Sequence, residues 1–231
     1  MSKYQKRISS PNYYPVKHEE GYYVLKGEGP YGESEGLPLG VVLRDVLGYA
    51  EDLDEAEEIL SRGQVLVNGS PRKNPNSTVG FMDSVSFPEI DEHFRVLVTS
   101  QGFALKEVDE EDAYRKLARV DDKTTLKGGV TQLNLYDGNN IETEEDYDTK
   151  SSLLVTLPDL EIEDEIRMEE GNLAYIRDGK HTGEVGEIVD IEELPGSRPA
   201  NVTLEGEEGE FQTVEDNVYM VGEDEPEVDV E

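Results

Sequence analysis

Histidine, cysteine and clustered carboxylates are the usual sources of catalysis and metal binding, and their placement in this sequence suits neither. The three histidines, His18, His93 and His181, lie far apart along the chain, and there is no cysteine. The many carboxylates show no EF-hand or zincin spacing, and no Walker pattern is present. We therefore predict that the chain is not an enzyme, with no catalytic residues, no metal ligands, no cofactor and no small-molecule substrate.

Lysine and arginine are the side chains whose spacing does suggest chemistry. The chain has 21 of them against 54 Asp and Glu, for a net charge of −33, yet residues 1–18 and 59–82 contain no acid. Residues 113–136 hold five cations against two acids. Such windows indicate that something excludes carboxylates, and a polyanion such as RNA is the simplest candidate. The alternative is that these cations pair with acids elsewhere in the fold.

The amino-terminal arm and a glycine-containing loop supply candidates that the residues themselves suggest. Pro11 and Pro15 forbid a helix through the arm, and its interleaved tyrosines can stack on bases or anchor the arm to the body. In the loop, a lysine precedes two glycines whose backbone N–H groups can approach an anion, although a plain turn explains them equally well. The candidates from these two regions are Lys3, Lys6, Arg7, Lys17, Lys123, Lys127, Gly128 and Gly129.

The acidity of the chain is interpreted as a sign of habitat. Low hydropathy with high net charge also fits disorder, but 12 Tyr, 5 Phe and recurring short apolar runs favour a folded protein. In about 1 M salt the Debye length falls to about 3 Å, which screens such self-repulsion, so the composition predicts a halophile-type protein. No segment reaches the roughly 18 apolar residues of a membrane span, and residues 1–10 do not resemble a secretory signal. We therefore expect a cytoplasmic protein.

The first third of the sequence predicts short elements with clear boundaries. Gly48 ends the first helix, Asp52 caps the second, and Asn68–Gly69 is a tight-turn pair. The expected elements are, in chain order, a strand over 21–26, a helix over 37–48, a helix over 54–62, a strand over 65–67 and a strand over 79–87.

This order of elements resembles the S4-type RNA-binding domain, in which two helices and the loop after them present a basic surface to folded RNA. Arg44 alone is not specific, because Asp45 or Glu51 could hold it instead. The resemblance implies RNA contact at the residues that stand at matching positions: Arg44, Arg62, Asn68, Arg72 and Lys73.

The rest of the chain predicts mostly strands. A hairpin over 94–98 and 103–108 is followed by a helix that begins after Asp109 and runs to about Arg119, and a strand covers 130–135. Further along, a glycine-punctuated hairpin resembles the KOW motif, which forms part of a small SH3-like barrel. That resemblance implies RNA contact at three loop residues: Arg177, Lys180 and His181.

Together these parts resemble the small-subunit ribosomal protein family S4e over nearly the whole chain. Val130, Tyr136 and Asn139 stand where basic residues are expected in that family, which weakens the case for RNA contact at these three positions. The implied fold is α+β and mostly β. Its expected parts are a basic arm and first strand (1–36), an S4-type domain (37–87), a central β-rich domain (88–160), a KOW/SH3-like barrel (161–222) and a solvated acidic tail (223–231).

The resemblance implies a non-catalytic component of the small ribosomal subunit that binds small-subunit rRNA and supports assembly. Its partners would be that rRNA and neighbouring ribosomal proteins, with no membrane. Other interpretations remain open at this point: a free-standing KOW-type transcription or translation factor, an RNA-modification enzyme or its RNA-guiding subunit, and an acidic interaction protein that mimics nucleic acid.

Overall fold

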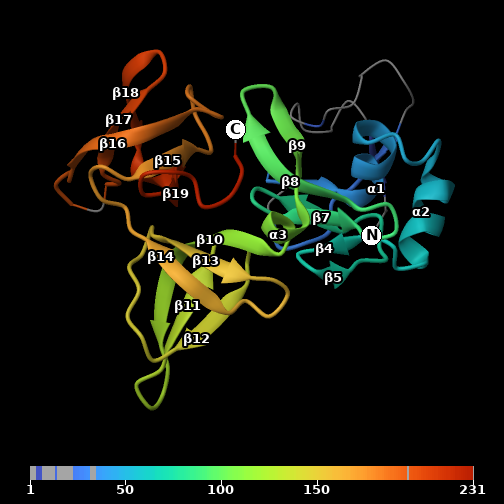
Figure 1. Cartoon of the computed structure of the whole chain (residues 1–231), viewed down its shortest axis with the longest axis horizontal. Coiled ribbons are helices and arrows are strands. Elements are labelled where there is room, and N and C mark those ends of the chain that lie inside the picture. Colours follow the sequence, from blue (N-terminus) through green and yellow to red (C-terminus); the bar gives the residue numbers. More distant parts are fainter. Residues whose placement is uncertain (1–3, 7–13, 15–22, 32–34, 197, 231) are drawn as a thin grey trace. The chain divides into compact units, whose positions relative to one another are not determined.

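The computed structural model describes residues 4–6, 14, 23–31, 35–196 and 198–230, and this part of the chain is built mainly of strands (Figure 1). The chain forms two compact units: unit 1 holds residues 1–97 and 101–114, and unit 2 holds residues 98–100 and 115–231. The predicted fold class is confirmed. No helix in the described ranges is long and apolar enough to cross a bilayer. The candidates Lys3, Arg7 and Lys17 lie outside the described residues.

The first two helical segments of unit 1 form where the sequence predicts them. α1 (Leu39–Val41) continues into the π-helical η2 (Val42–Val46), and Leu39, Val41, Val42 and Leu43 in this segment are fully buried. Gly48 ends this segment with a φ of 70°, a conformation that glycine adopts without steric cost. α2 (Leu53–Ser61) begins after Asp52, whose carboxylate accepts a backbone N–H bond at 2.9 Å and caps the helix.

The strands of unit 1 form one larger sheet and two small ones. Asn68 and Gly69, with φ values of 49° and 72°, make the tight turn expected of this residue pair. In the described part, β1 (Tyr4–Lys6) pairs with β2 (Tyr23–Leu25), and β3 (Gly36–Pro38) pairs with β6 (Thr78–Gly80). The larger sheet has the order β5 (Ser70–Pro71), β4 (Leu66–Val67), β7 (Ser84–Phe87), β8 (Glu92–Thr99) and β9 (Gly102–Val108). The hairpin β8–β9, assigned above to the central region, therefore extends the sheet of unit 1.

The prediction of a helix from residue 110 to about Arg119 is wrong beyond the first turn. α3 (Glu110–Ala113) is followed at once by the long strand β10 (Arg115–Thr125). Lys116 and Arg119 in this strand are buried, at 1% and 3% exposure. Groups far along the chain satisfy these two cations, and this tertiary pairing overrides the local helical pattern.

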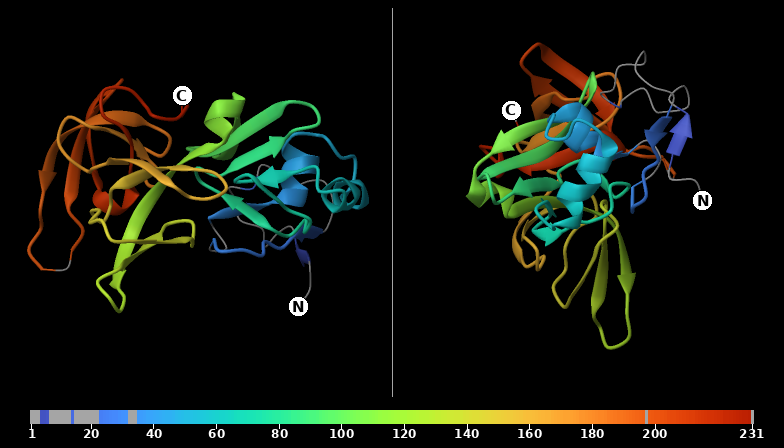
Figure 2. Two further views of the ribbon diagram at one scale, coloured as in Figure 1. Left: turned by 60° about the horizontal axis from the view of Figure 1, so that its bottom comes forward. Right: turned by 90° about the vertical axis from the view of Figure 1, so that its right-hand side faces the viewer.

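The first sheet of unit 2 is antiparallel and contains the central part of the chain. The hairpin of β10 and β11 extends beyond the rest of the sheet to an exposed turn (Figure 2). The strand order is β12 (Asn140–Thr143), β11 (Thr131–Leu135), β10, β13 (Ser152–Thr156) and β14 (Ile162–Ile166). One face packs into a core of Ala118, Val120, Leu133, Leu135, Leu153 and Val155.

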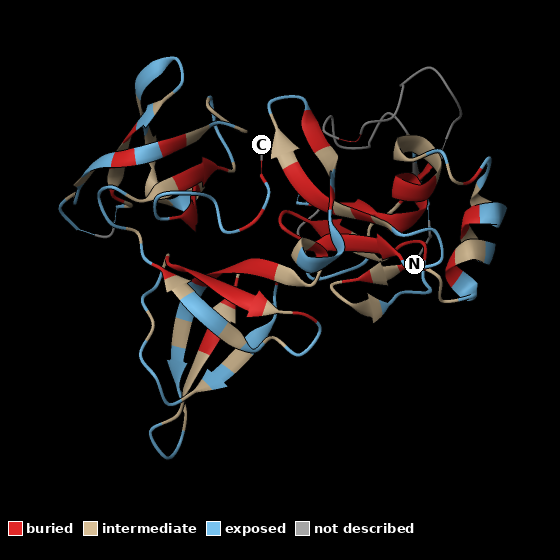
Figure 3. Ribbon diagram, viewed as in Figure 1, coloured by how far each residue is buried: buried red, intermediate tan, exposed pale blue. Residues whose placement is uncertain are grey.

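The second sheet of unit 2 has five antiparallel strands and fits the expected small barrel (Figure 3). Tyr175 is almost fully buried, and its hydroxyl donates a hydrogen bond to the Val98 carbonyl at 2.9 Å, which ties residues 98–100 to this unit. The strand order is β18 (Gly209–Val214), β17 (Asn201–Gly206), β16 (Val185–Glu192), β15 (Leu173–Ile176) and β19 (Val218–Gly222), with the short helix η3 (Glu215–Asn217) before β19.

The acidic segment after β19 is packed, so the prediction of a solvated tail is wrong there. Val228 and Val230 are 2% and 5% exposed, and the Glu227 N–H donates to the Val221 carbonyl at 2.8 Å. Valines alternate with acids in this segment, so the valines are buried while the acids next to them, Glu227 and Asp229, stay exposed.

Candidate nucleic-acid interface

The cations that the sequence marks as RNA-binding candidates fall into two groups in the structure. Arg44, Arg62, Lys123 and His181 have carboxylate partners, and Arg177 stacks on a tyrosine ring. The other group is exposed and makes no side-chain ion pair or hydrogen bond with any described residue: Lys6, Arg72, Lys73, Lys127 and Lys180. Members of this second group can meet an external anion without breaking an internal contact.

Arg72 and Lys73 lie in the loop between β5 and β6 of the S4-type region. The Arg72 backbone N–H donates to the Val65 carbonyl at 3.0 Å, which fixes the start of the loop. Asn68, another candidate in this region, has a different role. Its amide donates to Asp83 at 2.7 Å and accepts from the Ser84 N–H at 3.0 Å, so this side chain holds the turn in place.

Asp83 is a buried carboxylate that organises the same region. Besides Asn68, it accepts hydrogen bonds from the Tyr31 hydroxyl at 2.7 Å and from the Gly80 N–H at 2.8 Å. A carboxylate satisfied by several donors is stable in the interior and orients each of them. Asp83 thereby links the turn at Asn68 to a second loop of unit 1, a role that the sequence pattern did not suggest.

The other two arginines of the S4-type region are held by neighbouring acids. Arg44 forms a two-point contact with Asp45, Nε to Oδ1 at 3.1 Å and Nη2 to Oδ2 at 2.7 Å, so one of the alternatives considered above is realised. Arg62 pairs with Glu58 one helical turn earlier. The Arg62 side chain is 58% exposed, and exposed pairs of this kind contribute little, so Arg62 stays accessible.

The basic window 113–136 mostly follows the alternative of pairing with acids elsewhere. Lys123, for example, donates to the Tyr147 carbonyl at 2.6 Å and to Asp146 at 3.2 Å. Lys127, at the turn of the hairpin, is the cation of this window without a described carboxylate partner. Gly128 and Gly129 follow it with φ values of 94° and 87°. The paired cations are Arg115 with Glu163, Lys116 with Asp137, Arg119 with Asp121 and Lys123 with Asp146.

Tyr136 lies among guanidinium groups in unit 2. The Arg177 guanidinium lies 4.2 Å from the centre of its ring, and that of Arg119 lies 5.6 Å away. Arg119 also donates to the carbonyls of Asp216 and Val218, at 2.9 and 3.1 Å. Arg177 and Tyr136 therefore join the segments that follow β15 and β11, which are far apart in the sequence, and this gives both residues a structural role.

A buried ion pair lies next to this cluster. Lys116 Nζ and Asp137 Oδ2 are 2.6 Å apart, and Asn139 donates to the same carboxylate from its backbone and its side chain. Burial acts to raise the pKa of Asp137, but the charge and hydrogen bond of Lys116 outweigh it, so the pKa lies below its ordinary value. Nearby, the hydrogen bond from Lys150 holds the pKa of Asp216 below its usual range. No pattern in the sequence indicates either pairing.

The loop between β15 and β16 carries the remaining candidates. Gly179 and Gly183 have φ values of 97° and 93°, which explains the glycines of this turn. The His181 ring stacks on Phe211 at 4.3 Å, and its Nδ1 lies 3.0 Å from Glu184. His181 is thus fixed against the barrel, whereas Lys180 next to it is exposed.

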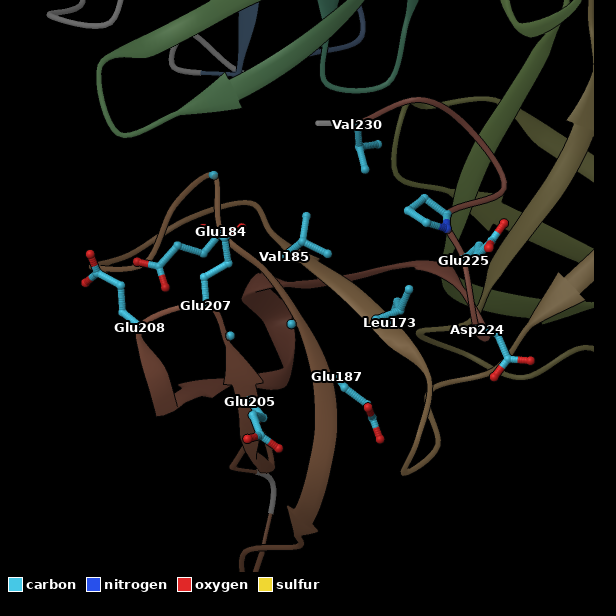
Figure 4. Close-up of a pocket in the computed structure, with 14 residues that line it drawn as sticks. Leu173, Glu184, Val185, Glu187, Glu205, Glu207, Glu208, Asp224, Glu225 and Val230 are labelled. Atoms are coloured by element: carbon cyan, nitrogen blue, oxygen red, sulfur yellow. The ribbon is translucent and has the colours of Figure 1, made fainter.

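An acidic groove of about 790 Å³ lies on the barrel of unit 2 (Figure 4). Within the described ranges no group of His, Cys, Asp or Glu has the arrangement of a metal site. A surface of this charge repels a polyanion, so it is unsuited to RNA. The carboxylates that line it are Glu184, Glu187, Glu205, Glu207, Glu208, Asp224 and Glu225.

Comparison with known proteins identifies the family. Residues 39–85 match the model of the S4 domain, and residues 90–162 match that of the ribosomal family S4e. The small ribosomal subunit protein eS4 of Methanosphaera stadtmanae is 45% identical over 226 residues, which cover 97% of this chain and 94% of that protein. The chain belongs to the ribosomal S4e family.

Other relatives of this S4e chain agree in sequence and fold. The eS4 protein of Haloarcula marismortui is 42% identical over 228 residues, covering 96% of this chain and 97% of the relative. The crystal structure of the 30S ribosomal protein S4e from Thermoplasma acidophilum has a TM-score of 0.70 and 33% identity, covering 81% of this chain and 95% of that one. The family and the S4 domain predicted from sequence are confirmed.

Proposed function

We propose that this S4e protein is a non-catalytic constituent of the small ribosomal subunit that binds small-subunit rRNA and supports subunit assembly in translation. One observation carries the proposal: in a chain of net charge −33, the cations that have no side-chain partner among the described residues include the S4-type loop pair Arg72 and Lys73. The relatives named small ribosomal subunit proteins, and the RNA-binding S4 domain, support it further. Its partners would be rRNA and neighbouring ribosomal proteins, on cytoplasmic ribosomes.

Whether a cation already has a carboxylate partner decides how much we expect it to contribute to RNA binding. A paired cation must exchange its own carboxylate for a phosphate, so its net gain on binding is small. An exposed cation without such a partner gains a charge-assisted hydrogen bond at no comparable cost. We therefore place the main contacts at Arg72, Lys73, Lys127, Lys6 and Lys180, the last of which lies in the KOW-type loop of the barrel. Lys3, Arg7 and Lys17 remain predictions for the arm.

Charge reversal in the S4-type loop tests the proposal. We expect Arg72→Glu with Lys73→Glu to weaken binding to small-subunit rRNA about 100-fold, because two charge-assisted bonds of about 1.5 kcal/mol each are lost. A matched control reverses Arg167 and Arg198, exposed cations outside the candidate surface, with the same change in net charge. Binding is measured by filter retention in concentrated KCl. An equal loss from both double variants would contradict the assignment.

Co-sedimentation separates the ribosomal role from the alternatives. We expect the protein to co-sediment with small ribosomal subunits in concentrated salt. A free-standing KOW-type factor, or the guiding subunit of a modification enzyme, would sediment apart from them under these conditions.

The halophile-type character is part of the proposal. Because the chain carries 54 acids, repulsion between them is strong in dilute buffer and screened in concentrated salt. We expect circular dichroism to show loss of structure as KCl is lowered from molar concentrations. Full structure in dilute buffer would contradict the habitat interpretation without affecting the family.

A further inference from the structure

The far end of the β10–β11 hairpin, residues 124–132, is called here the hairpin tip. It contains no acidic residue, although the chain has 54. The register pairs Thr125 with Thr131, and the Leu126 N–H donates to the Val130 carbonyl at 2.8 Å. The neighbouring strand β12 ends its pairing opposite Thr131, so the turn beyond it has no strand beside it (Figure 2).

The turn presents hydrogen-bond donors that the described part of the molecule leaves unused. Lys127 is exposed without a partner there, and no hydrogen bond joins the backbone N–H groups of Lys127, Gly128 or Gly129 to another described residue. A Cβ placed on either glycine would meet nothing within 4 Å. Internal packing therefore does not crowd this backbone, and a ligand can approach it closely.

A chain of neutral polar side chains continues from the turn along one face of the hairpin, where the exposed acids Glu142 and Asp122 stand opposite Gln132 and Asn134. The Gln132 amide donates to the Asn134 oxygen at 2.7 Å, and the Asn134 amide donates to the Thr124 hydroxyl at 3.2 Å. These bonds orient the three groups and leave one N–H of each amide and the hydroxyl hydrogen for a partner. On the opposite face, Leu133 is fully buried in the core.

We propose that the hairpin tip is a second RNA-docking element, which grips the ribose–phosphate backbone chiefly through neutral donors. The inference deepens the proposed function and rests on it. The backbone N–H groups, the ammonium group and the amides are donors, which match phosphate oxygens and ribose hydroxyls. The β17–β18 hairpin offers the contrast within the same unit, since its turn carries Glu207 and Glu208.

Neutral donors have a particular value in concentrated salt. Ion pairs with phosphate lose affinity as salt rises, because the gain from counterion release falls. A hydrogen bond from an amide or a backbone N–H releases no counterion, so its contribution stays nearly constant. The hairpin tip would therefore hold RNA under the conditions that weaken contacts such as those of Arg72 and Lys73.

A binding series in salt tests this division of roles. We expect Gln132→Ala with Asn134→Ala to weaken binding of the full chain to small-subunit rRNA about tenfold, with an unchanged slope of log K against log salt. Arg72→Glu with Lys73→Glu should lower the slope itself. The matched control, Asn201→Ala with Gln212→Ala, removes two amides from β17 and β18 and should bind as the parent does. Parent-like binding by the Gln132/Asn134 variant would overturn the inference.

Tethered cleavage gives a second readout that does not depend on affinity. Because the chain has no cysteine, Thr125→Cys carries an iron–EDTA probe at one site only. In reconstituted subunits we expect rRNA cleavage from Thr125→Cys and none from Glu208→Cys. Absence of cleavage from Thr125→Cys, or a probe at that site that attacks a protein neighbour instead, overturns the inference. If loss of binding on reversal of Arg72 and Lys73 accompanies that result, the proposed function stands.

Discussion

The buried pair of Lys116 and Asp137 should dominate the stability of unit 2. Its side chains are 1% and 4% exposed, and its charged atoms are 2.6 Å apart. Removing one partner leaves the other charge in the interior, which costs about 3 to 5 kcal/mol. At about 2 to 4 °C per kcal/mol for a protein of this size, Asp137→Asn should lower Tm by about 6 to 20 °C.

A double-mutant cycle separates this electrostatic effect from lost packing. Asp137→Asn keeps the shape of the side chain and an oxygen that can accept from Asn139, and Lys116→Met keeps most of the buried volume. We expect each single change to be strongly destabilising and the double variant to recover most of the loss, because no unpaired charge then remains. Urea unfolding in concentrated KCl, followed by circular dichroism, measures all four proteins. Additive losses in the double variant would refute the reasoning.

Three smaller perturbations follow from the same unit. The folded pKa of Asp137 lies below the unfolded value of about 4, so the stabilisation from this carboxylate is complete above pH 4 and is lost as the pH falls through the folded pKa. Urea unfolding from pH 6 to 3 should therefore show the unfolding free energy of the parent approaching that of Asp137→Asn. Tyr136→Leu should cost about 1 kcal/mol of unfolding free energy by removing the ring beneath Arg177, and Tyr136→Phe, which keeps the ring, should cost less. Gly186→Ala should destabilise by about 1 to 3 kcal/mol in thermal unfolding, because its Cβ would lie 2.9 Å from the backbone oxygen of Glu205.

Local signals in the sequence predicted much of unit 1. Asp52 caps α2, Gly48 ends the preceding helical segment, and Asn68–Gly69 turns between β4 and β5, as their residue types imply. Each of these features depends on a few neighbouring residues. That is why they are readable without knowledge of the tertiary structure, and why the S4-type region was recognisable.

Features that depend on distant partners were not predictable in this way. The strand β10 replaced an expected helix because Lys116 and Arg119 find Asp137 and Asp216 far along the chain. For the candidate interface, the absence of acids marks the basic windows, whose RNA contacts stay a prediction. It could not separate Lys123, which Asp146 holds, from Lys127, because the acid that makes the difference lies outside the window.

The segment of residues 98–100, at the end of β8, limits how the molecule can be dissected. The chain on either side of this segment belongs to unit 1, yet the segment itself belongs to unit 2, where Val98 accepts the hydroxyl hydrogen bond of Tyr175. A fragment that starts at Arg115 would leave that buried hydroxyl without its acceptor, and Gly183 would lose its neighbour Thr99. A transplanted carboxy-terminal half would therefore lack Val98 and Thr99, which come from the other half of the sequence and lie against its Tyr175 and Gly183.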